Sequence, residues 1–249
     1  MVNSFVAGQT GAPAAIRVGD VLADSLRLFL TRAVPFIGLS LIAFAPTFIL
    51  GLLVSRSTGT SGAAVGGFIA VFVRLACSSL ANAAIIYGVV QELRGRGFTF
   101  GDSLSIGFAR LGPVIGLSLL VGILVTLAAI LLVVPGIIVW CVYAVVVPVC
   151  VVETLGPTAS MTRGAFLTKG NRWRIFGVFA LIFIASIVVG GIVGGLAGLA
   201  GGTRLIQVAT FAIEAVIGAF NAVVVGVLYY QLRVAREGAD IEKIAAVFD

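Results

Sequence analysis

The chain has 249 residues, of which 60% are hydrophobic and 10% are charged, and its mean hydropathy is +1.21. Soluble domains hold about 25% charged residues, so this composition excludes an ordinary water-soluble protein. The net charge of +6 would raise the question of nucleic acid in a soluble chain, but membrane topology explains it better here, and we expect no nucleic-acid partner.

Six apolar segments are long enough to cross the hydrocarbon core of a bilayer, which takes about 20 helical residues. The third and fourth form one apolar run, in which Pro135-Gly136 predicts a tight hairpin. The fourth segment is short and contains Pro148, which favours a kink. The sequence therefore predicts an all-α integral membrane protein, one membrane domain over residues 1–249. Its six transmembrane helices lie at approximately 33–54, 66–90, 112–133, 137–152, 175–200 and 205–232.

Lysine and arginine accumulate on the cytoplasmic side of a membrane where the loops are short. Thirteen of the sixteen basic residues lie on the side of the N-terminus, Arg56 and Arg204 lie on the other side, and Arg74 is inside a span. This imbalance predicts that both termini are cytoplasmic.

The sequence also suggests three copies of one unit, in which an amphipathic helix precedes a hairpin of two spans. Gly19-Asp20-Val21-Leu22 in the first unit matches Gly101-Asp102-Ser103-Leu104 in the second. The predicted amphipathic helices cover about 16–31, 99–110 and 157–168. We expect them to act as interfacial elbows that orient the spans; the alternative is that they are wedges that sense or impose lipid packing.

Two ionisable residues fall inside spans, where charge is costly. Arg74 in the second span and Glu214 in the sixth lie at similar depths, so we expect them to pair. Asn82 and Asn221 follow about two turns later and are expected to face the same seam. The pair predicts a buried clamp between the first and third units, and a proton or solute path is the alternative.

A row of glycines at four-residue spacing runs along the fifth span. Small residues at this spacing allow helices to pack closely in lipid. We expect packing within the chain, and a homo-oligomer contact is the alternative. The row consists of Gly190, Gly194, Gly198 and Gly202.

No catalytic or cofactor-binding motif is present. The chain has no histidine and only three cysteines, which are dispersed within apolar spans, so the usual general base and metal ligands are missing. Phosphate-binding glycine loops and the nucleophile elbow are also absent. We therefore expect no enzymatic activity, no cofactor and no metal.

The most specific stretch runs from the fourth span into the fifth and includes Pro148, Glu153 and the run Leu167-Thr168-Lys169-Gly170-Asn171-Arg172-Trp173-Arg174. It resembles bacterial multi-pass proteins grouped as the membrane domain of glycerophosphoryl diester phosphodiesterase. The phosphodiesterase barrel of some members does not follow here, and its histidines and acidic metal ligands are absent. The resemblance thus implies a bacterial inner-membrane protein without that activity.

Three functional hypotheses follow. The first is a non-enzymatic scaffold or lipid-organising protein, whose basic surface contacts anionic lipid headgroups through Lys169, Arg172 and Arg174. The second is a transporter or channel for a small or lipidic solute, with a mid-membrane cavity at the intramembrane polar residues. The third is an accessory subunit for a separately encoded enzyme.

Overall fold

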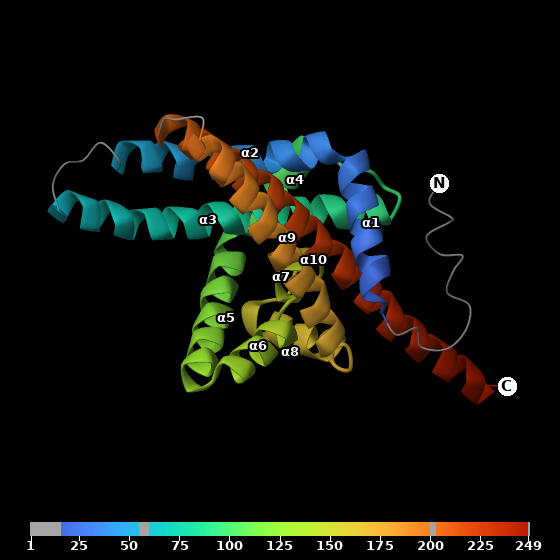
Figure 1. The fold of residues 1–249 in the computed structure, drawn as a ribbon. Helices are drawn as coiled ribbons and strands as arrows, with labels where there is room; N and C mark the ends of the chain where they lie inside the picture. Colours follow the sequence, from blue (N-terminus) through green and yellow to red (C-terminus); the bar gives the residue numbers. More distant parts are fainter. Residues whose placement is uncertain (1–15, 55–59, 200–202, 249) are drawn as a thin grey trace.

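The computed structural model describes residues 16–54, 60–199 and 203–248, and all regular structure within these ranges is helical (Figure 1). Within these ranges the long helices form three hairpins, and a shorter helix precedes each hairpin. In chain order the helices are α1 (Val18–Thr31), α2 (Ala33–Val54), α3 (Thr60–Leu93), α4 (Phe100–Ala109), α5 (Leu111–Leu131), α6 (Val133–Val142), α7 (Val146–Val152), α8 (Pro157–Thr168), α9 (Arg172–Leu199) and α10 (Thr203–Phe248).

Six segments of the described chain are long and apolar enough to cross a membrane, as the sequence predicted. Most bounds agree within a few residues, but α10 continues as a helix to Phe248, well beyond the predicted end at residue 232. The candidate spans are Ala33–Leu53, Gly66–Leu93, Leu111–Leu131, Val133–Val152, Arg172–Leu199 and Leu205–Glu237. The chain is therefore a multi-pass membrane protein.

The hairpin between the third and fourth spans turns earlier than predicted. Leu132 adopts an extended backbone (φ −163°, ψ 146°) between α5 and α6, while Pro135 and Gly136 lie in the first turn of α6. Proline is tolerated there because the first amides of a helix have no partner within the helix. A Cβ at Gly136 would lie 2.8 Å from the Cβ of Ala129, so this glycine lets the two helices approach rather than making the turn.

The fourth span is interrupted. The helix stops at Val142 and resumes at Val146, and Pro148 lies in the first turn of α7, so the kink predicted at this proline takes the form of a break just before it. Within the break, the amide of Val146 donates to the carbonyl of Tyr143 (3.1 Å). The hydroxyl of Thr168, the last residue of α8, donates to the carbonyl of Val142 (2.9 Å). A helix from elsewhere in the chain thus satisfies a carbonyl that the break releases.

The packed core lies at one end of the hairpins, which we call the basic end because Arg32, Arg94, Arg110, Arg172 and Arg233 flank it. Buried residues of α2 stop at Ala43, those of α3 begin at Cys77, and the last in α5 is Leu117. In α9 they run from Ile175 to Ile182, with Ala197 as the exception. We call the halves of the hairpins that lie away from the basic end the far halves. They carry mostly exposed apolar side chains, including Leu53, Phe68, Ile123, Leu127, Phe183, Ile187 and Leu196.

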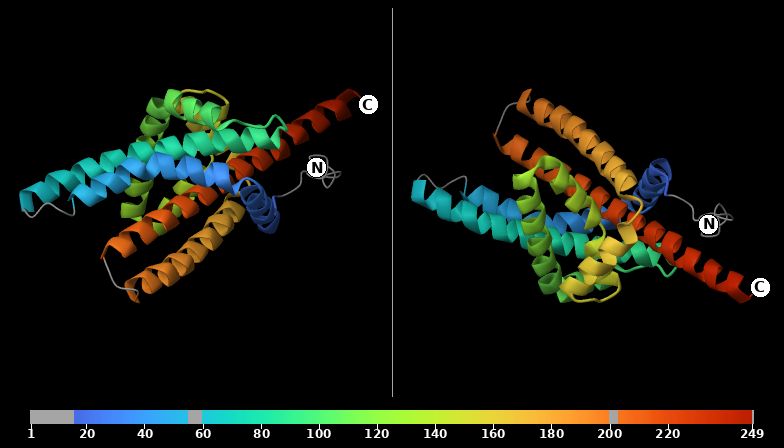
Figure 2. Two further views of the ribbon diagram at one scale, coloured as in Figure 1. Left: turned by 90° about the horizontal axis from the view of Figure 1, so that it is seen from above. Right: turned by 90° about the horizontal axis from the view of Figure 1, so that it is seen from below.

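The hairpins leave this core in different directions. Figure 1 shows α5 running steeply away from α3, so the α5–α6 hairpin does not lie alongside α2–α3. Figure 2 shows α9 on the outer side of α10, away from α2 and α3. In the far half, α10 still touches the first hairpin through the rings of Phe48 and Phe211, whose centroids are 4.6 Å apart. The resulting assembly is packed at the basic end and open toward the far end.

Helix α1 packs more of its apolar face on the protein than an interfacial elbow would. Val21, Leu28 and Phe29 are buried in the core, and Phe29 meets the ring of Phe220 edge-on at 5.5 Å. Leu26 and Leu30 remain exposed, by 50% and 67%. Only a part of the predicted apolar face is thus free to meet lipid.

Close approach of α3 and α10 at the basic end depends on Gly226, where a Cβ would lie 2.7 Å from Cγ1 of Val89. We predict that Gly226→Leu forces these helices apart and lowers the free energy of unfolding by about 1–3 kcal/mol, the usual cost of overpacking. Gly116→Leu on α5 is the matched control, because nothing lies within 4 Å of a Cβ there. Detergent-solubilised variants compared by SDS titration would check this, and equal midpoints would contradict it.

Candidate functional site

The predicted intramembrane ion pair is present. Nη2 of Arg74 on α3 lies 3.4 Å from Oε2 of Glu214 on α10. The pair is not the buried clamp that the sequence favoured, since 64% of the Arg74 side chain and 46% of the Glu214 side chain remain exposed. It joins the first and third hairpins in their far halves, on a surface open to the surroundings of the protein.

The two asparagines do not complete a polar seam. Asn82 is half-buried and Asn221 is exposed, and neither forms a hydrogen bond with another described residue. A buried hydrogen bond between these hairpins is instead made by Ser40, whose hydroxyl donates to the carbonyl of Ala215 (2.8 Å). Of the four predicted seam residues, the structure brings together only the ion pair.

The glycine row of α9 does not pack against the rest of the described chain. A Cβ at Gly190, Gly194 or Gly198 would meet no heavy atom within 4 Å, and Gly202 lies outside the described residues. The predicted packing within the chain is therefore absent at these three positions. Contact with a second copy stays a prediction.

The predicted headgroup contacts lie together on the surface of the basic end. Lys169, Arg172 and Arg174 are all exposed, and Trp173 among them is 79% exposed. Gly170 adopts φ +88°, a left-handed conformation that turns the chain sharply between α8 and α9. An amphipathic aromatic ring surrounded by cations is typical of a membrane–water interface.

A charged network that sequence reasoning missed ties α7, α8 and α10 together. Glu153 accepts hydrogen bonds from Nε of Arg163 (3.1 Å) and from the buried hydroxyl of Tyr229 (2.9 Å). Arg163 also donates to Glu237, which accepts from Nε of Arg233 at 2.8 Å. Only the Arg233–Glu237 pair carries a local signal, the four-residue spacing of partners on one helix.

The electrostatics of this network keep Arg163 charged. Burial by itself would lower the pKa of Arg163, but hydrogen bonds and charge from Glu153 and Glu237 outweigh burial and raise its pKa. A cation held between two carboxylates stabilises both. The network therefore holds the helices together through ion pairs, and we do not interpret it as a proton-transfer site.

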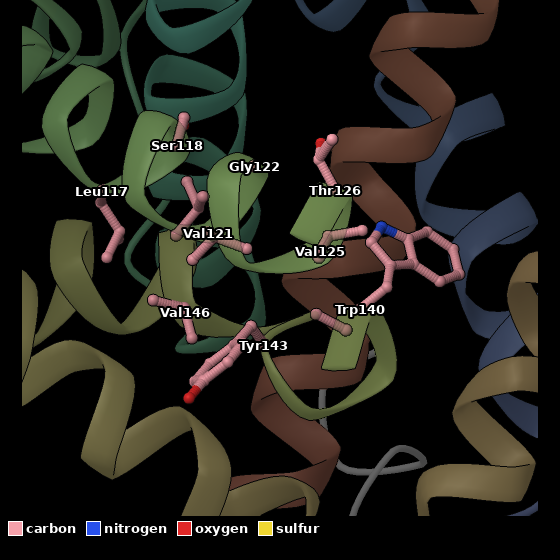
Figure 3. Close-up of a pocket in the computed structure, with 11 residues that line it drawn as sticks. Leu117, Ser118, Val121, Gly122, Val125, Thr126, Trp140, Tyr143 and Val146 are labelled. Atoms are coloured by element: carbon pink, nitrogen blue, oxygen red, sulfur yellow. The ribbon is translucent and has the colours of Figure 1, made fainter. Parts of the chain in front are cut away.

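A surface pocket lies beside the interruption of the fourth span, and a second, smaller one lies at the basic end. The volume of the first is about 400 Å³, and it is lined by residues between 117 and 126 of α5 and between 140 and 147 of the fourth span (Figure 3). The second, of about 230 Å³, lies between Arg94, Tyr230 and Arg233. Neither pocket is lined by the predicted seam residues.

Among the described residues, no group of three histidine, cysteine, aspartate or glutamate side chains is placed to hold a metal ion. Comparisons of the chain with models of protein families, with curated proteins and with solved structures found no match.

We predict that the Arg74–Glu214 pair is energetically coupled. Arg74→Ala leaves Glu214 without its counterion inside a span, at a cost of about 2–3 kcal/mol on insertion scales. Glu214→Ala should cost a similar amount, and the double variant should be more stable than either single one. Unfolding by SDS titration of the reconstituted proteins measures the cycle. Losses that simply add would show that the two side chains do not interact.

We predict that Glu153→Ala destabilises the basic end, because Arg163 and the buried hydroxyl of Tyr229 then lose an acceptor. The expected loss in the free energy of unfolding is about 2–4 kcal/mol. Glu92→Ala is the control: it removes an ion pair with Arg32, whose side chain is 51% exposed while that of Glu92 is 22% exposed, and should cost about 0–1 kcal/mol. If both variants unfolded at the same SDS fraction, the network would have no special role.

Proposed function

We propose that the protein is a non-enzymatic, lipid-organising protein of a bacterial inner membrane. The observation that carries this proposal is the one-ended core, which leaves the far halves of the hairpins with exposed apolar side chains such as Phe68, Ile123 and Phe183. In a membrane, lipid chains must cover these side chains and fill the space between diverging hairpins. The protein then displaces lipid unequally in the two leaflets.

Charge supports an orientation with the basic end, and with it both termini, in the cytoplasm. The exposed group Lys169, Arg172 and Arg174 suits anionic headgroups, which attract each nearby Lys or Arg by about 1 kcal/mol. The exposed Leu26 and Leu30 of α1 can enter the same leaflet. We include in the proposal the threefold repeat of a short helix and a hairpin, and the resemblance to the phosphodiesterase membrane-domain family.

A transporter for a small or lipidic solute is the second candidate. The interrupted fourth span favours it, since discontinuous helices commonly line transport sites. The exposed Arg74–Glu214 pair supplies charge at membrane depth. However, the pocket beside the interruption lacks both residues, so charge and cavity do not coincide. The lipid-organising function needs no such coincidence.

Reconstitution into vesicles tests the leading proposal. In vesicles of phosphatidylethanolamine and phosphatidylglycerol, increasing protein should reduce the mean diameter seen by electron cryomicroscopy and change acyl-chain order reported by a fluorescent probe. Replacing Lys169, Arg172 and Arg174 with Gln should weaken the preference for phosphatidylglycerol by up to about 3 kcal/mol. Arg17 is exposed where α1 begins, and Arg17→Gln removes a single charge for comparison. It should change the preference for phosphatidylglycerol by at most about 1 kcal/mol.

Unchanged vesicle size, unchanged lipid order and no enrichment of anionic lipid with the purified protein would together refute the lipid-organising function. Passage of a trapped solute, abolished by Arg74→Ala, would favour the transporter instead. Co-purification of a stoichiometric enzyme from native membranes, with no lipid effect, would favour the accessory-subunit hypothesis.

A further inference from the structure

The pocket of about 400 Å³ exists because the fourth span is interrupted. Residues 143–145 form a turn between α6 and α7, so the chain bends away from α5 over this stretch. Figure 3 shows Trp140 and Tyr143 on one side and Val121, Gly122 and Val125 of α5 on the other. Its walls are mainly apolar, and both lie within candidate membrane spans.

Three hydroxyl groups line this pocket without a partner in the described chain. Ser118, Thr126 and Tyr143 form no hydrogen bond with another described residue. The hydroxyls of Thr47, Ser78, Ser186 and Thr210 in other spans donate to carbonyls of their own helix, whereas the buried hydroxyl of Ser79 in α3 has no partner in the described chain. Because an unpaired hydroxyl is costly in lipid, the pocket suits a ligand that is mostly apolar but carries acceptor oxygens.

A cation without a partner lies on the basic side of the pocket. Arg110 immediately precedes α5, is half-buried, and forms no side-chain hydrogen bond or ion pair with a described residue. Leu117, which lines the pocket, follows it by seven residues, so Arg110 lies about two helical turns from the pocket, toward the basic end. The rise from Arg110 to Leu117 is about 10 Å, within the depth of one leaflet of a bilayer about 30 Å thick.

We propose that this pocket binds one acyl chain of an anionic glycerophospholipid, whose phosphate pairs with Arg110. The ester oxygens of the lipid accept from Ser118, the pocket hydroxyl nearest to Arg110 along α5. From the basic end inward, the protein thus offers a cation, a hydroxyl donor and apolar walls. This is the order in which the lipid carries its phosphate, its ester oxygens and its acyl chain. The inference rests on the proposed lipid-organising function and names a specific ligand for it, distinct from the lipids that surround the far halves.

Photocrosslinking with a lipid probe tests this site. The full chain is reconstituted in phosphatidylcholine vesicles containing phosphatidylglycerol with a photoactivatable group in its acyl chain, and labelled residues are located by mass spectrometry. We expect labelling at 117–126 and 140–147 to exceed, at least fivefold, labelling of the exposed far half of α9, which reports surrounding lipid. Uniform labelling of all exposed apolar residues would overturn the proposal.

Two variants separate the acyl-chain site from the headgroup site. Gly122→Leu places a side chain in the pocket without a clash, whereas the control Gly116→Leu adds the same side chain outside the pocket on the same helix; a Cβ at either position meets nothing within 4 Å. We expect Gly122→Leu to reduce pocket labelling about tenfold and the control to leave it unchanged. Equal labelling in these two variants would overturn the acyl-chain site.

Arg110→Gln tests recognition of the headgroup. It should reduce pocket labelling by the phosphatidylglycerol probe about fivefold, and labelling by a phosphatidylcholine probe by less than twofold. An equal loss with both probes would overturn the role of the phosphate. A labelled pocket in a protein that leaves vesicles unchanged would refute the lipid-organising function alone, and a vesicle effect with an unlabelled pocket would refute this site alone.

Discussion

The fold depends on helix packing that is confined to the basic end. Burial of the apolar faces of α3 and α10 there is made possible by Gly226, which lets Val89 approach the backbone of α10. The far halves have no comparable core, so apolar burial within the protein cannot hold them in place. In the proposed lipid-organising function, lipid would replace there the side-chain neighbours that a soluble bundle supplies.

Charges in the structure divide according to their surroundings. At the basic end, Glu153, Arg163 and Glu237 form a network in which each side chain has partners of opposite charge, and it joins the consecutive helices α7 and α8 to α10, which is distant in sequence. Arg74 and Glu214 have only each other and are largely exposed. The network fixes how α8 packs on α10. The Arg74–Glu214 pair instead determines which faces of α3 and α10 face each other outside the core.

Hydropathy was sufficient to predict the six spans, and similar depth in two neighbouring spans was sufficient to predict the Arg74–Glu214 pair. The spans depend on local length and composition, whereas the distant pair could be predicted because charges inside spans are rare and costly. The turn at Leu132 was missed because Pro135 and Gly136 also fit the first turn of a helix that packs closely against Ala129. The charged network was missed because Glu153 and Tyr229 are 76 residues apart, and no pattern in a single sequence reports that contact. The α9 glycines have the right spacing, but their use depends on a partner surface that the chain does not supply.

The interruption of the fourth span shows how a distant helix determines local structure in lipid. Pro148 cannot donate to the carbonyl of Ala144 and its ring crowds that carbonyl, so the sequence disfavours a continuous helix through residues 143–145. The break is stabilised because Thr168 donates to the carbonyl of Val142, and because Gly164 lets α8 approach Val146, where a Cβ would lie within 2.5 Å of Cγ2. Docking of α8 thus compensates the hydrogen bonds that the break removes. The pocket beside α5 follows from that docking, so any ligand held there is coupled to the position of α8 and, through Arg163, to the charged network.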